Sequence, residues 1–199
     1  GAVDAGCGGG KCYRMFSMFD TQKAFAALVK ALDSNADGTV DDLDPLCEVN
    51  LVGYSWGGVN AAELARRLLV ADNVAPARKR IDKLVVIDGF APTAGGRIEV
   101  AANVLRAWQY RHTKAPADDC SIHAPLGPYV GLPFVCTDAT RCREYDYSSA
   151  PGAGPSVDHC TIVRTATSAV LENLRTGEDA AQPPPLATPV RDQAQPLRR

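Results

Sequence analysis

Apolar side chains recur along the chain at spacings that separate helices from strands. From Asp20 onward, four of them fall three and four positions apart and predict one buried helix face: Phe25, Leu28, Val29 and Leu32. The short apolar run from Val49 to Val52 predicts a strand. A second helical stripe follows it, formed by Ala61, Leu64, Ala65 and Leu68.

The second half of the chain continues this alternation. Leu84 to Ile87 is fully apolar and bounded by charged residues, which is typical of a central strand in a parallel sheet. Residues 100–110 fit either a strand or a helix, and we predict a strand from about Asn103 to Tyr110. A last helix ends at Gly177, and its apolar stripe is Ile162, Ala166, Ala169, Val170 and Leu174.

Two long stretches lack this periodicity. Residues 120–155 are rich in proline, glycine and aromatic residues, which favours a lid or substrate-binding loop region. Residues 178–199 include three consecutive prolines and few large apolar residues, so we expect an extended or disordered tail. Residues 1–177 therefore predict a single α/β domain with a mainly parallel sheet flanked by helices.

Composition narrows the class of protein. The 199 residues carry a formal net charge of −2 and are 46% hydrophobic, which suits one soluble domain with a sizeable core. There is no basic excess of the kind that binds nucleic acid, and no apolar run long enough to cross a bilayer. We expect a monomer that acts on a small-molecule or lipid substrate.

Seven cysteines indicate an oxidising compartment. Cys7 with Cys12, and Cys136 with Cys142, resemble small disulfide-closed loops, so we expect a secreted or periplasmic protein. A metal site is the alternative, but these spacings differ from the usual zinc pattern and the loops lack histidine. Because seven is odd, one thiol is left over, and Cys47 and Cys160 are the candidates.

Residues 33–44 resemble the calcium-binding loop of an EF-hand. Gly38 stands at position six, where the loop turns sharply, and Asp44 replaces the usual glutamate at position twelve, as in extracellular dockerin-like repeats. The resemblance implies a structural Ca²⁺ ion that braces the entry to the strand at 49–52; the alternative is a solvated acidic loop. The expected ligands are Asp33, Asn35, Asp37, Thr39, Asp41 and Asp44.

The segment Gly53-Tyr54-Ser55-Trp56-Gly57 joins the strand at 49–52 to the helix that follows. A serine between such glycines, on a strand-to-helix turn, is typical of a nucleophile elbow. The glycines two positions before and after Ser55 are expected where side chains would collide. A tight turn with a surface serine is the alternative.

Two further residues complete a candidate catalytic set. Asp88 ends the strand at 84–87, where sites of open α/β sheets gather, and His159 precedes the last helix. With the elbow, the order Ser55, Asp88, His159 resembles the α/β-hydrolase superfamily of serine esterases, lipases and peptidases. The resemblance implies a reduced α/β-hydrolase fold in which Ser55 is the nucleophile, His159 the base and an aspartate its partner.

The identity of the acid is open from the sequence. Most members of that superfamily carry it one strand later, which corresponds to Asp118 or Asp119, whereas the pancreatic-lipase branch has it at the Asp88 position. We favour Asp88. Asp158 is interpreted as loop structure, and the two remaining histidines, His112 and His123, as surface residues.

The sequence identifies only one of the two backbone N–H donors expected in an oxyanion hole. The backbone N–H of Trp56 is one expected donor, and residues 6–13 are a candidate source of the second. The sequence thus predicts a serine hydrolase that cleaves carboxylic esters and needs no organic cofactor. The alternatives are a hydrolase-like binding module without activity and a calcium-dependent extracellular interaction domain.

Overall fold

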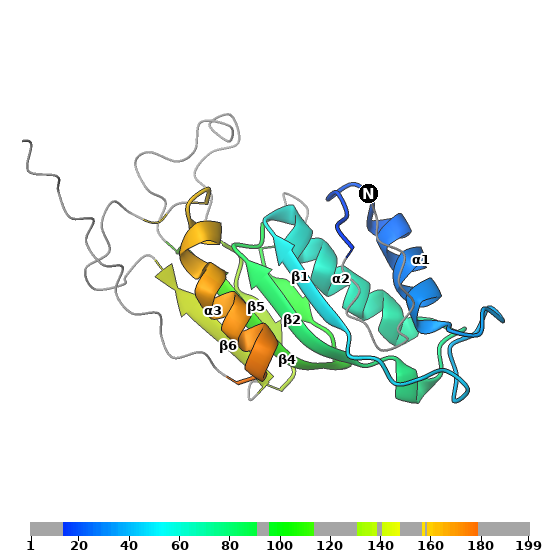
Figure 1. Ribbon diagram of the computed structural model, residues 1–199. Helices are drawn as coiled ribbons and strands as arrows, with labels where there is room; N and C mark the ends of the chain where they lie inside the picture. Colours follow the sequence, from blue (N-terminus) through cyan, green and yellow to red (C-terminus); the bar gives the residue numbers. More distant parts are fainter. Residues whose placement is uncertain are drawn as a thin grey trace, which may run out of the picture.

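A four-stranded sheet occupies the centre of the described chain (Figure 1). The computed structural model describes residues 14–90, 96–113, 131–138, 141–147, 157 and 159–178. The strands lie in the order β1-β2-β4-β6, and each neighbouring pair is parallel. Their bounds are β1 Asn50–Tyr54, β2 Ile81–Ile87, β4 Val104–Arg111 and β6 Cys142–Asp146. The α/β class with a mainly parallel sheet is therefore confirmed.

Helices cover both faces of this sheet. They are α1 (Thr21–Leu32), α2 (Trp56–Val70) and α3 (Ile162–Thr176), and a short 3-10 helix, η1 (Pro76–Arg78), precedes β2. Successive side chains of a strand point to opposite faces. Leu84 and Val86 accordingly pack in one core with α1 and α2, and Val85 and Ile87 in a second core with α3. The stripes read from the sequence for these helices face the two cores.

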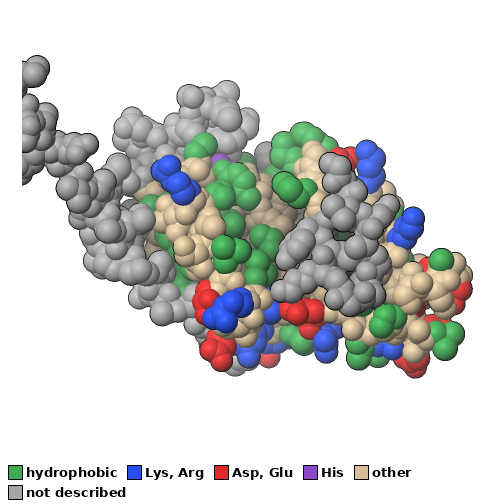
Figure 2. All heavy atoms as spheres, in the orientation of Figure 1, with side chains coloured by type: hydrophobic (Ala, Val, Ile, Leu, Met, Phe, Trp, Pro, Cys, Tyr) green, Lys and Arg blue, Asp and Glu red, His purple; other side chains and the backbone are tan. Residues whose placement is uncertain are grey.

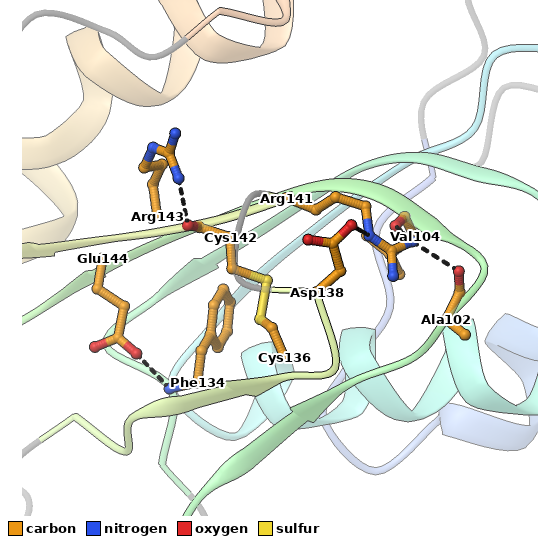
Figure 3. The surroundings of a disulfide bond; sticks show 9 residues. All are labelled: Ala102, Val104, Phe134, Cys136, Asp138, Arg141, Cys142, Arg143 and Glu144. Carbon is orange, nitrogen blue, oxygen red and sulfur yellow. Dashed lines mark hydrogen bonds and ion pairs between the residues drawn. A yellow bond between two sulfur atoms is a disulfide. The ribbon is translucent and has the colours of Figure 1, made fainter.

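A second, two-stranded parallel sheet pairs β3 (Ile98–Val100) with β5 (Phe134–Cys136). A disulfide between Cys136 and Cys142 joins β5 to β6 and confirms the predicted pairing of these two cysteines (Figure 3). Beside it, the Phe134 N–H donates to Glu144 at 2.7 Å. The two sheets are thus linked covalently and by hydrogen bonds.

One expectation for the later half of the chain is wrong. Residues 134–136 and 142–146 form strands, although we expected only loops between 120 and 155. The short β5 has no periodicity to reveal it, and β6 is mostly polar and is defined by its pairing with β4. Of the two candidates for the odd thiol, Cys160 is disulfide-bonded, so Cys47 remains.

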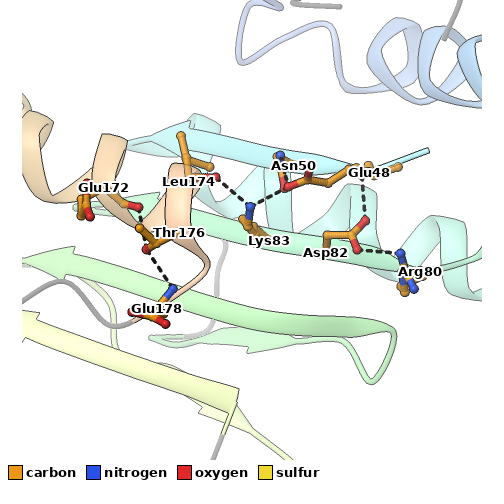
Figure 4. A network of polar contacts seen from close by, with 10 residues as sticks. Glu48, Asn50, Arg80, Asp82, Lys83, Glu172, Leu174, Thr176 and Glu178 are labelled. Carbon is orange, nitrogen blue, oxygen red and sulfur yellow. Dashed lines mark hydrogen bonds and ion pairs between the residues drawn. The ribbon is translucent and has the colours of Figure 1, made fainter. Parts of the chain in front are cut away.

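Charged side chains gather where β1 and β2 begin (Figure 4). The Lys83 ammonium lies 2.5 Å from Glu48 and donates to the carbonyl of Leu174 near the end of α3, at 2.7 Å. The last turn of α3 therefore lies at the amino end of the strands, and its first turn lies at their carboxyl end. In Figure 2 a group of charged side chains of both signs lies along the lower edge, and others lie at the upper left and upper right, while hydrophobic ones gather over the region of β1 and α3.

Within the described ranges, no helix is both long enough and apolar enough to span a bilayer.

Candidate active site

Ser55 is the single residue between β1 and α2. Its φ of 55° and ψ of −129° lie in a region that residues with a side chain rarely adopt, at a cost of about 1–3 kcal/mol. The surroundings hold it there, because the Ser55 N–H donates to the carbonyl of Ile87 at 3.0 Å and the Ser55 carbonyl accepts from Gly58 at 2.9 Å. The strained turn predicted from the glycine pattern is present.

Two glycines of this turn are required by close contacts, and one of them is not the glycine that we expected. A Cβ at Gly53 would lie 2.2 Å from the Gly57 carbonyl oxygen, so only glycine fits there. At Gly57 a Cβ would meet nothing within 4 Å, so the expected collision at that position is wrong. The collision would occur at Gly58 instead, since a Cβ there would lie 2.6 Å from a methyl group of Val86 on β2.

Three side chains from distant parts of the chain meet at the carboxyl end of the sheet. The Ser55 Oγ lies 2.9 Å from Nε2 of His159, and Nδ1 of His159 lies 2.5 Å from Oδ2 of Asp88. His159 lies just before α3, and Asp88 directly follows β2 with a φ of 47°. Both are buried, whereas Ser55 is only half-buried. Of the aspartates considered as the acid, Asp88 contacts His159; Asp118, Asp119 and Asp158 lie outside the described residues.

Electrostatics fix the proton positions in this chain of hydrogen bonds. Burial raises the pKa of the Asp88 carboxyl, but the imidazoles of His112 and His159 together lower it by more, so the pKa lies below its ordinary value. Asp88 is therefore ionised at neutral pH and can only accept hydrogen bonds. It follows that Nδ1 of His159 carries the proton, and that Nε2 is the lone-pair atom that accepts from the Ser55 hydroxyl.

Tyr54, the residue before the serine, holds His159 from a second side. Its hydroxyl donates to the carbonyl of His159 at 2.8 Å, and its ring stacks on the imidazole with centroids 4.8 Å apart and planes at 27°. The sequence gives no sign of this contact, because 105 positions separate the two residues. Tyr54 thereby links the turn at Ser55 to the segment that carries His159.

Tyr54→Phe should lower the kcat of any Ser55-dependent reaction by about 2–10-fold, the value of one net hydrogen bond. The change removes only the hydroxyl that holds the His159 carbonyl and keeps the stacked ring. Tyr54→Leu removes both and should cost more. Steady-state kinetics of the two variants test this, and a Tyr54→Phe enzyme as fast as the parent would contradict it.

His112 was interpreted as a surface residue, and this is wrong. Its side chain is fully buried, and its Nδ1 lies 2.8 Å from Oδ2 of Asp88, while its backbone N–H donates to Oδ1 at 3.1 Å. Polar neighbours in the sequence suggested exposure. The better signal is position, because His112 directly follows β4, as Asp88 follows β2 and Ser55 follows β1, and the ends of parallel neighbours meet at one edge.

Gly131 closes the far side of the Asp88 carboxylate. Its N–H donates to the carbonyl of His112 at 3.0 Å. A Cβ at this position would lie 2.4 Å from Oδ1 of Asp88 and 2.6 Å from Cβ of Arg111. Only glycine therefore lets this segment pass so close to the acid, a requirement that the sequence did not reveal.

One expected oxyanion donor lies in the described chain. Trp56 opens α2, and the first N–H groups of a helix have no carbonyl partner within it. Its N–H is thus available beside Ser55, at the positive end of the helix dipole. The candidate source of the second donor, residues 6–13, lies outside the described residues, as does His123.

The acidic loop at 33–44 is shaped by hydrogen bonds to its own carboxylates. Asp33 accepts from the N–H groups of Asp37 at 3.2 Å and Gly38 at 2.9 Å, and the buried Asp44 accepts from those of Ser34 at 2.6 Å and Asp41 at 3.0 Å. Gly38 has the positive φ of 94° that its turn position requires. Among the described residues no group of three or more His, Cys, Asp or Glu is arranged to hold a metal ion. Calcium binding here stays a prediction.

Removing calcium should lower the melting temperature by about 5–10 °C if calcium otherwise exceeds its Kd 100-fold. The physical reason is that a bound cation offsets repulsion among the loop carboxylates. Thermal unfolding with calcium and with a chelator measures the difference, and Asp44→Asn should abolish it, whereas the exposed Asp72→Asn should not. An unchanged melting temperature in chelator would count against the site.

Comparison of the chain with protein-family models, with curated proteins and with solved structures gives no match in any of the three.

Proposed function

We propose that the protein is a serine hydrolase that cleaves carboxylic esters through an acyl-enzyme on Ser55. The observation that carries this proposal is the hydrogen-bonded chain from Ser55 Oγ through His159 to the buried Asp88, at 2.9 Å and 2.5 Å. A serine at a positive φ, aimed at a histidine that is itself oriented by an ionised carboxylate, is an arrangement suited to nucleophilic catalysis.

The chemistry follows from the proton positions. Ser55 Oγ attacks the ester carbonyl carbon while Nε2 of His159 takes the hydroxyl proton, and Asp88 stabilises the resulting imidazolium. When the tetrahedral intermediate collapses, the same proton passes to the departing alkoxide, which leaves as the alcohol. Water then attacks the acyl-enzyme, with His159 again accepting a proton, and the acid is released as Ser55 regains its hydrogen.

The start of α2 would stabilise the negative charge that forms on the carbonyl oxygen. The Trp56 N–H is the donor we assign, and the helix dipole adds to it. Removing one oxyanion donor typically costs about 10²–10³ in kcat, so a site with a single donor would be slow but still active.

The groups around Ser55 favour an ester with an apolar acyl part. Tyr54 and Trp56 flank the serine, and the ring of Phe19 packs edge-on against Trp56 with centroids 6.0 Å apart. Phe19 remains 76% exposed, which leaves an aromatic surface open beside the nucleophile turn. We infer that short or medium acyl esters bind here, and that residues 120–155 contribute to their selection.

The proposed fold is a reduced α/β-hydrolase fold. It is supported by the order Ser55, Asp88, His159 along the chain, by the parallel strands β1 and β2 and by the nucleophile turn. The acid directly follows β2, the strand beside the nucleophile strand, which is the arrangement expected for the pancreatic-lipase branch.

Hydrolysis of p-nitrophenyl esters of increasing acyl length tests this proposal. We expect release of p-nitrophenol by the parent, with the best kcat/KM at short or medium length, and none above background for Ser55→Ala. Equal hydrolysis by the two proteins would refute the assignment.

A further inference from the structure

The carboxylate of Asp88 is shared by two histidines. Its Oδ2 lies 2.5 Å from Nδ1 of His159 and 2.8 Å from Nδ1 of His112. Its Oδ1 accepts the backbone N–H of His112 at 3.1 Å. All three side chains are at least 98% buried, so no bulk water competes for these oxygens. The proposed triad uses only one of the two histidines, which leaves the role of His112 to be explained.

We propose that His112 is a positioning residue of the proposed hydrolase, which fixes the carboxylate of Asp88 so that one oxygen stays aimed at His159. This inference rests on the proposed function of Ser55, His159 and Asp88. His112 acts through Asp88 and touches neither the substrate nor Ser55 in this account.

Contact with both oxygens is what gives His112 this role. A carboxylate with one partner can rotate about its Cβ–Cγ bond and exchange its oxygens. The backbone N–H of His112 holds Oδ1 while its ring lies against Oδ2, so a single residue opposes that rotation. The ring contact is a close polar contact of 2.8 Å between Nδ1 and Oδ2, and the backbone N–H is the hydrogen bond that His112 donates to Asp88, at 3.1 Å.

The position of His112 is itself fixed from both sides. Its carbonyl accepts the Gly131 N–H at 3.0 Å, and the Asp88 N–H donates to the Tyr110 carbonyl at 2.6 Å, which joins the ends of β2 and β4. The two imidazole rings are 6.4 Å apart with planes at 53°, so they flank the acid rather than stack on each other. The backbones of both His112 and Asp88 are therefore hydrogen-bonded at this edge of the sheet.

The contact also favours the ionised acid. A fully buried carboxyl without donors would tend to stay protonated, and a protonated Asp88 could not stabilise an imidazolium. The lowered pKa of Asp88 agrees with the two imidazoles that lie against it. His112 thus contributes to the charge of the acid as well as to its orientation.

A matched pair of substitutions separates this role from simple packing. His112→Asn keeps a side-chain N–H donor close to the place of Nδ1 but removes volume. His112→Phe keeps a ring of similar size but removes the donor. We expect His112→Asn to retain most of the kcat of the parent. We expect His112→Phe to lose about 10–100-fold in kcat with little change in KM, which is the size of loss seen when a residue that orients a metal ligand is removed.

Both variants are compared as folded protein, with circular dichroism and thermal unfolding measured beside the kinetics. Packing alone predicts the reverse order, because the phenyl ring fills the space and asparagine does not. A His112→Phe enzyme as fast as or faster than His112→Asn would therefore overturn the inference.

A readout that needs no turnover keeps the inference distinct from the proposed function. In nitrogen-15 histidine-labelled protein, we expect Nδ1–H signals of both His112 and His159 shifted downfield, and both should move in Asp88→Asn. A His112 signal whose chemical shift is the same in Asp88→Asn as in the parent would overturn the inference. Coupled signals in a parent that does not hydrolyse esters would refute the proposed function and uphold the His112–Asp88 contact.

Discussion

Ser55→Ala is expected to lower kcat for ester hydrolysis by at least about 10⁴-fold. In the proposed mechanism the hydroxyl that lies 2.9 Å from Nε2 of His159 forms the acyl-enzyme, and alanine would leave His159 and Asp88 with nothing to activate. The variant should fold, because alanine is smaller and the backbone contacts of the turn do not involve the side chain.

The control for this change is Ser168→Ala, which removes a hydroxyl from an exposed position of α3. It should hydrolyse p-nitrophenyl esters at the rate of the parent. A rate that persists in Ser55→Ala would assign the activity to another residue or to a contaminant, and the proposed mechanism would then be wrong.

Asp88→Asn is expected to lower kcat by about 10⁴-fold, with KM nearly unchanged. An amide can present its N–H₂ group to His159 where the carboxylate accepted a hydrogen bond, which favours the tautomer whose Nε2 carries hydrogen. That tautomer cannot take the proton of Ser55. The amide also has no charge with which to stabilise the imidazolium that forms during the reaction.

The sequence left Asp118 and Asp119 as rivals for the acid, and they provide the comparison. Asp118→Asn and Asp119→Asn should retain most of the turnover, and so should Asp42→Asn, whose side chain is 90% exposed. If Asp88→Asn keeps its activity while one of the later variants loses it, the role of the acid belongs to the later loop.

Periodicity predicted the larger elements because burial determined them. The stripes at 25–32, 61–68 and 162–174 pack against the two cores, and the helices extend over 21–32, 56–70 and 162–176. The predicted strand at 103–110 is β4, which lies between two other strands of the sheet. Trp108 and Tyr110 of this strand are buried. Its spacing fitted a helix as well, and only pairing with β2 and β6 decides between them.

The parts that could not be predicted depend on contacts between distant residues. The short β3 and β5 carry too few residues for a period, and β6 is mostly polar, so neither an alternating nor an apolar pattern marks it. His112 looked exposed from its neighbours, yet it lies against a carboxylate 24 positions earlier in the chain. A polar residue directly after a strand of a parallel sheet is the pattern that would have pointed to it.

The three side chains of the candidate site could be predicted from the sequence, but the residues that pack around them could not. Ser55, Asp88 and His159 were named from a motif, a strand end and chain order, which are local features. Tyr54 and Gly131 were not, because one stacks on His159 and the other is pressed against Asp88 only after the chain has folded. The sequence around each of these two residues does not predict such a contact.

Labelling with a fluorophosphonate probe tests the central claim most directly. Ser55 Oγ should displace fluoride from phosphorus and form a stable adduct, which mass spectrometry of the digested protein would locate on Ser55, with calcium and without it. The adduct should be absent from Ser55→Ala and much slower to form in His159→Ala. A folded parent that stays unlabelled at Ser55 would contradict the account and favour a binding module without activity.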